Sequence, residues 1–191
     1  MKFTFEKDDI PFIDKNLYIE FSKELRSIRK MIRKEYGPID KTYSTVINFN
    51  SSNSIVTEAK EKIKLVKMSL PIYVMNAKTI DEIYQRNLNL SHECIHTITP
   101  SSDASKTTYL EEGLAVMFSE KYTNSDSMPP DKYNKARGYV LELLKHDETI
   151  IKKLRKKYIH LKLSDYTCEM IKEIIPTVDN VLLQNLTTRF Y

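Results

Sequence analysis

The chain has 191 residues, a net charge of +4, three glycines and two cysteines. Its length predicts one domain built around a single hydrophobic core. The scarcity of glycine excludes a glycine-rich phosphate loop, and the small net charge gives no reason to expect nucleic-acid binding. Two cysteines are too few for a disulfide framework, although a single Cys94–Cys168 bond stays open.

The sequence shows no segment suited to a membrane. It has no run of about 18 apolar residues, and its first residues, MKFTFEKDDIPF, lack the apolar region of a signal peptide. We therefore expect a cytoplasmic protein whose partner is neither a membrane nor a nucleic acid.

The N-terminal part of the chain combines one long helix with short strands. Residues 2–5 have strand character, and residues 14–36 repeat apolar side chains at steps of three and four, which predicts a helix that ends at Gly37-Pro38. Further strands are then predicted from β-branched, aromatic or alternating apolar residues at 42–49, 62–68 and 70–75.

Helices dominate the rest of the chain. Thr79 and Glu82 have the spacing of a capping box and predict the start of a helix over about 80–98. Further helices are predicted over 108–122, 131–145, 148–158, 165–175 and 178–189. This order of a helix, a small sheet and then helices indicates an α+β domain rather than alternating βαβ units.

Two basic stretches raise the question of a charged partner. One is the sequence KKLRKK at 152–157, which is interleaved with apolar residues at helical spacing. The other is the polar face of the predicted helix 14–36. We predict that both are solvent-exposed helix faces rather than binding surfaces. The basic residues of the second face are Lys23, Arg26, Arg29, Lys30, Arg33 and Lys34.

The sequence HECIH at 92–96 places two histidines four positions apart in the predicted helix 80–98. His92 and His96 then lie one turn apart on one face, where each can give a nitrogen to the same tetrahedral metal ion. Glu93 is rotated by about 100° from His92 and stands beside the metal, where it can take a proton from a metal-bound water and return it to a leaving amine. Cys94 points away and is predicted to be a buried thiol.

A second motif, YLEEGLAVMFSE at 109–120, completes a resemblance. HExxH followed by L-x-E-G-L-A resembles the gluzincin-type zinc metallopeptidases, the thermolysin-like and aminopeptidase-like zincins, over about residues 80–122. The resemblance implies a zincin-like fold, Zn²⁺ as cofactor and a peptide or protein substrate. It also implies Glu93 as general base and a ligand set of His92, His96 and Glu112.

The helical wheel independently favours Glu112 over Glu111 as the third ligand. Glu111 borders a stripe of bulky residues, which we expect to pack on the C-terminal helices. Glu112 lies on the opposite arc, among small residues that allow close approach to a neighbouring helix. Alternatively, both glutamates are only exposed acids of the first turn. The bulky stripe is Leu110, Leu114, Met117 and Phe118, and the small residues are Gly113, Ala115, Val116 and Ser119.

Two parts of the expected site have no motif. Val116 occupies the position where some relatives carry an acid that holds a zinc histidine, so that partner must come from elsewhere or be a backbone carbonyl. The donor that stabilises the oxyanion is also unassigned, and Tyr139 alternatively belongs to the core. The candidates are Tyr133, Arg137, Tyr139, His146 and His160.

These patterns predict a zinc-dependent metallopeptidase, a hydrolase that cleaves peptide bonds through a zinc-activated water. We expect a single domain over 1–191, in which 1–122 carry the N-terminal helix, the small sheet and the zinc-site helices, and 123–191 form a helical C-terminal subdomain. Two alternatives are a non-catalytic zinc-binding module for protein interaction and a dedicated effector or toxin protease. The sequence leaves open the substrate, exo- or endo-cleavage and the oligomeric state.

Overall fold

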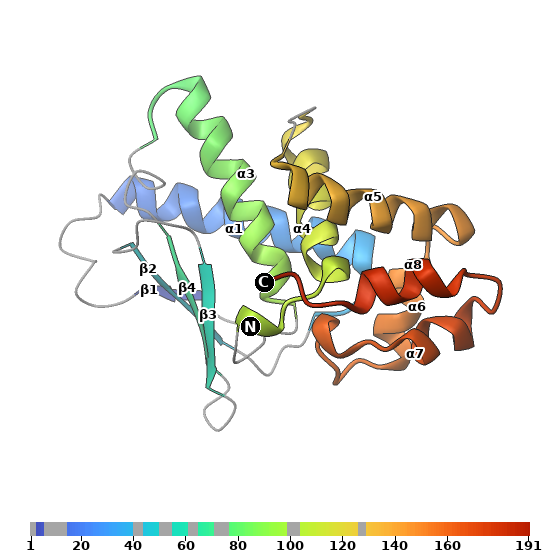
Figure 1. The fold of residues 1–191 in the computed structure, drawn as a ribbon. Helices are drawn as coiled ribbons and strands as arrows, with labels where there is room; N and C mark the ends of the chain where they lie inside the picture. Colours follow the sequence, from blue (N-terminus) through green and yellow to red (C-terminus); the bar gives the residue numbers. More distant parts are fainter. Residues whose placement is uncertain are drawn as a thin grey trace.

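The computed structural model describes residues 3–5, 15–39, 44–49, 55–60, 65–70, 77–98, 104–125 and 129–191. The strands are β1 (Phe3–Phe5), β2 (Ser44–Asn48), β3 (Ile55–Lys60) and β4 (Leu65–Ser69). The helices are α1 (Lys15–Tyr36), α3 (Ile80–His96), α4 (Tyr109–Thr123), α5 (Asp131–His146), α6 (Ile150–Lys157), α7 (Cys168–Ile174) and α8 (Asn180–Thr187), with short 3₁₀ turns at Ala104–Lys106 and Leu163–Asp165. The sheet lies on one side of α3, and α5 to α8 lie on the other (Figure 1).

The described strands form one small mixed sheet in the order β1-β2-β4-β3. β1, β2 and β4 run parallel, whereas β3 is an edge strand that runs antiparallel to β4 and contacts α3. The parallel pair β1 and β2 is joined through α1, so the chain contains one βαβ unit that the order of elements did not predict. The molecule is therefore mixed and mostly helical, which is compatible with the expected α+β class.

The predicted elements lie close to the observed ones. Thr79 caps α3 as expected: its hydroxyl accepts from the backbone N–H of Glu82 at 3.2 Å, and the Glu82 carboxylate accepts from the backbone N–H of Thr79 at 2.9 Å. The sequence did not predict β3. Of the predicted strand at 70–75, residues 71–75 lie outside the described residues.

Two arginines that we predicted to be exposed are buried. Arg29 of α1 is 6% exposed and Arg155 of α6 is fully buried, and Nε of Arg155 donates to the carbonyl oxygen of Pro38 at 3.0 Å. The prediction was wrong at both positions. Arg155 can be buried because its guanidinium finds an acceptor in Pro38, which is far away in the sequence. The other basic residues of both stretches are exposed, as predicted.

Helix α4 lies at the centre of the core and is buried along almost its whole length. Its bulky side does not pack only on the C-terminal helices as expected: the Phe118 ring meets the Tyr36 ring of α1 with centroids 5.9 Å apart. Gly113 was expected on the face of α4 that carries Glu112, opposite the C-terminal helices. In the structure it lies directly against α5, one of those C-terminal helices. A Cβ at Gly113 would overlap the carbonyl oxygen of Ala136 and come within 2.6 Å of a methyl group of Val140.

No helix in the described segments is long and apolar enough to cross a lipid bilayer.

We expect Gly113→Ala to destabilise the protein, because the added methyl group pushes α4 away from the backbone of α5. Overpacking of this kind costs roughly 1–3 kcal/mol, which thermal unfolding would detect. Gly138→Ala is the matched control, since nothing lies within 4 Å of a Cβ at that position. Alanine in an exposed helix interior should stabilise by about 0.5–1 kcal/mol relative to glycine. Equal effects of the two variants would contradict the close α4–α5 contact.

Candidate metal centre

The C-terminal half of α3 and the first turn of α4 bring the predicted ligands together. His92 faces the first turn of α4. Two turns earlier in α3, the Tyr84 hydroxyl donates to Ser125, just after the end of α4. These two contacts show that α3 and α4 pack antiparallel. Thr108 caps α4 by accepting from the backbone N–H of Glu111 at 3.4 Å. This cap fixes where α4 begins and so places Glu112 opposite the histidines.

The three predicted ligands form a compact group. Nε2 of His92 lies 3.3 Å from Oε2 of Glu112, Nε2 of His96 lies 3.6 Å from Oε1 of Glu112, and the two Nε2 atoms lie 3.4 Å apart. Two atoms that each lie about 2.0–2.1 Å from a tetrahedral ion are about 3.4 Å apart. His92, His96 and Glu112 can therefore hold a metal ion.

Burial of the Glu112 carboxylate supports a metal at this position. Glu112 is 2% exposed, and among the described residues its Oε2 atom accepts no hydrogen bond of good geometry, although Nε2 of His92 lies 3.3 Å away. A buried carboxylate oxygen without a partner is unfavourable unless a cation or a donor compensates it. The donor set of two imidazoles and one carboxylate fits such a cation and leaves one tetrahedral position for a water or substrate.

Glu111 holds one of the histidines from the other side. Its Oε1 lies 2.8 Å from Nδ1 of His96, and the side chain is almost fully buried. In the neutral imidazole, Nδ1–H can then donate a hydrogen bond to Glu111. The lone pair of His96 is in that case on Nε2, which faces Glu112 and His92. Glu111 is therefore the histidine partner that no motif predicted. The alternative that both glutamates are exposed acids is wrong.

Charges in this group change the protonation of its members. Burial alone lowers the pKa of His96, but the carboxylates of Glu112, Glu111 and Glu93 outweigh it and raise the pKa to about 10. Burial raises the pKa of Glu112, but His96 and His92 outweigh it and lower that pKa. In the metal-free protein, a protonated His96 therefore lies beside the ionised carboxylate of Glu112 at neutral pH.

Glu93 and two tyrosines lie around the same group. Glu93 is 7% exposed. The pKa values of Tyr133 and Tyr191 are raised mainly by burial and by the charge of Glu112, and the charge of Glu93 raises both further. The Tyr133 ring meets the His92 ring edge-on, with centroids 6.1 Å apart. The Tyr191 hydroxyl donates to Oε1 of Glu112 at 3.4 Å and lies 3.3 Å from the Tyr133 hydroxyl. Sequence reasoning missed Tyr191, for which there was no motif.

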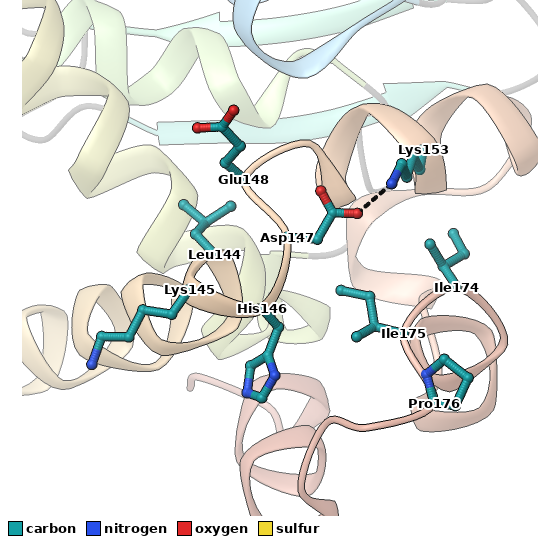
Figure 2. A pocket seen from close by; sticks show the side chains of 9 residues that line it. All are labelled: Leu144, Lys145, His146, Asp147, Glu148, Lys153, Ile174, Ile175 and Pro176. Carbon is teal, nitrogen blue, oxygen red and sulfur yellow. Dashed lines mark hydrogen bonds and ion pairs between the residues drawn. The ribbon is translucent and has the colours of Figure 1, made fainter.

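The other proposed oxyanion donors lie elsewhere. Arg137 pairs with Glu120 at 2.6 Å, and the Tyr139 ring packs on the Tyr109 ring with centroids 5.7 Å apart. His160 is exposed. His146 lines a separate hollow beside Ile175 and the Asp147–Lys153 ion pair (Figure 2). Tyr133 is therefore the one of the five candidates that contacts a predicted metal ligand in the described structure.

The cysteines take no part in this group. Cys94 is fully buried, as predicted, and neither Cys94 nor Cys168 forms a disulfide.

Comparison of the chain with protein-family models, curated proteins and solved structures gives no match.

We expect Glu112→Ala to weaken zinc binding at least as severely as His92→Ala or His96→Ala, because each removes one ligand. Glu111→Gln should weaken it by about 10–100-fold, the usual effect of losing a hydrogen-bond partner of a histidine ligand. Zinc affinity would be measured by competition with a chromophoric chelator. Glu148→Gln, in the turn after α5, is the control. A larger loss in Glu111→Gln than in Glu112→Ala would move the ligand to Glu111.

We expect zinc binding at pH 8 to release about one proton per chain. With a pKa of about 10, His96 is protonated in the metal-free protein at this pH, and its Nε2 must lose the proton to become a ligand. Calorimetry in two buffers of different ionisation enthalpy measures the release, and its absence would contradict the protonated state.

The same shift also predicts how pH affects folding of the metal-free protein. A pKa raised from 6.5 to about 10 on folding stabilises the native state fully below about pH 6.5, and this contribution disappears as pH rises through 10. Zinc affinity should rise over the same range.

Proposed function

We propose that the protein is a zinc-dependent metallopeptidase of gluzincin type. The observation that carries this proposal is the spacing of 3.3–3.6 Å among the nitrogens of His92 and His96 and the oxygens of Glu112. Two imidazoles and one carboxylate form a ligand set that catalytic zinc sites use. An edge strand that contacts α3 also suits a zincin-like arrangement, in which a small sheet accompanies the helix that carries HExxH.

When bound, zinc supplies a Lewis acid that polarises the scissile carbonyl group and lowers the pKa of water toward 7. Glu93 acts as the general base: it takes one proton from the attacking water as the carbon–oxygen bond forms. The C–N bond then breaks, and Glu93 returns that proton to the leaving amine. The carboxylate is therefore regenerated at the end of each turnover.

Tyr133 is suited to bind the carbonyl oxygen as negative charge develops on it. It comes from α5, whereas Glu93 comes from α3, and its ring contacts the ring of a proposed ligand. Burial raises the pKa of its phenol, so the hydroxyl keeps its proton and remains a hydrogen-bond donor at neutral pH. Such a donor stabilises the oxyanion more than the neutral carbonyl group.

We expect Glu93→Gln to retain zinc and to lose peptide hydrolysis by about 10²–10⁴-fold, because the amide cannot accept the proton. The assay uses a library of fluorogenic peptides with metal content measured on the same samples. Glu142→Gln is the control, since it removes one negative charge from an exposed part of α5.

The outcomes separate the candidate functions. Hydrolysis by Glu93→Gln at the wild-type rate would show that Glu93 is not the base. A zinc-loaded wild type that cleaves nothing in the library would favour the non-catalytic interaction module. Cleavage restricted to one protein substrate would favour the dedicated effector or toxin protease.

A further inference from the structure

The segment Thr188–Tyr191 is fastened to the start of α4. The carbonyl oxygen of Thr188 accepts from the backbone N–H of Tyr109 at 3.1 Å, and that of Thr107 accepts from the backbone N–H of Phe190 at 2.8 Å. The Phe190 ring is 1% exposed and lies 4.9 Å from the Tyr133 ring, centroid to centroid. These contacts fix the segment against the turn that carries Glu112. In Figure 1 the C-terminal end accordingly lies beside the end of α3.

Because the segment is fixed, the Tyr191 side chain reaches one particular oxygen of Glu112. Its hydroxyl donates to Oε1 at 3.4 Å. The other oxygen, Oε2, is fully buried and faces Nε2 of His92 at 3.3 Å; among the described residues it accepts no hydrogen bond of good geometry. The two oxygens of one carboxylate therefore lie in different environments.

This difference matters because both oxygens are close to the imidazoles. Oε2 lies 3.3 Å from Nε2 of His92, and Oε1 lies 3.6 Å from Nε2 of His96. Distance alone would let Glu112 bind a metal through either oxygen or through both. A carboxylate bound through both would occupy the position that a water or substrate needs.

We propose that Tyr191 is a positioning residue that engages Oε1 of Glu112 and so commits Oε2 alone to the metal. The inference rests on the proposed zinc site and adds to it a reason for an open coordination position. Tyr191 contributes through Glu112 and need not touch the substrate. The residue as a whole is 64% exposed, so removal of its hydroxyl leaves the core intact.

The test uses Co²⁺ bound to the metal-free protein, because cobalt reports its coordination number by visible absorption. We expect the Co²⁺ complex of Tyr191→Phe to absorb more weakly than that of wild type, because a freed Oε1 adds a ligand. Alternatively, the variant binds Co²⁺ about 10–100-fold less tightly, because the carboxylate is no longer held. Tyr109→Phe is the matched control: the Tyr109 ring lies 5.1 Å from the Phe190 ring in the same aromatic cluster, and the change removes a hydroxyl for which the structure records no bond to Glu112 or Tyr191. Circular dichroism checks that each variant is folded.

Each outcome has a defined meaning. A changed spectrum or affinity in Tyr191→Phe, with little change in Tyr109→Phe, supports the proposal. Wild-type spectrum and affinity in Tyr191→Phe, or equal changes in both variants, would overturn it while the metal site stands. Failure of the wild-type protein to bind Co²⁺ or Zn²⁺ would overturn the proposed function and this inference together.

Discussion

Burial of two adjacent carboxylates at the start of α4 is the constraint on which the rest of the structure depends. Glu111 and Glu112 are 3% and 2% exposed, and a buried carboxylate without compensation is strongly unfavourable. Compensation comes from the helix N-terminus, from the imidazoles of α3 and from the Tyr191 hydroxyl. Because these groups lie on separate elements, α3, α4 and the C-terminal segment must be in place together.

The packing of α4 explains how those elements keep their relative positions. Gly113 lets the backbone of α5 approach, Phe118 packs on Tyr36 of α1, and Glu112 faces α3. Contacts on several sides leave α4 little freedom to shift or rotate. This matters because metal ligands must be placed to within a few tenths of an ångström, and a helix fixed by dense packing provides that precision.

What the sequence could predict was set by how local each signal is. The histidine pair, the capping box and the buried stripe of α1 depend on residues three or four positions apart, and the structure has them where predicted. The position of Glu112 beside the histidines was predicted from the resemblance to the gluzincin motif, with support from the helical wheel. Tyr191 is 79 positions from Glu112, and Arg155 is 117 from Pro38, so their contacts follow from the tertiary fold and have no local signal. The parallel pairing of β1 and β2 is likewise a long-range feature.

The pairing of His96 with Glu111 and Glu112 has a consequence for the order of folding and metal loading. A protonated imidazole between two carboxylates is an internal counter-ion, so the site carries its own positive charge before any metal arrives. Many small zinc domains fold only with their metal, because metal binding supplies their folding free energy. This chain, which also has a large apolar core, is expected to fold first and to exchange a proton for the metal afterwards. Metal scarcity would then leave a folded protein with an empty site rather than an unfolded chain.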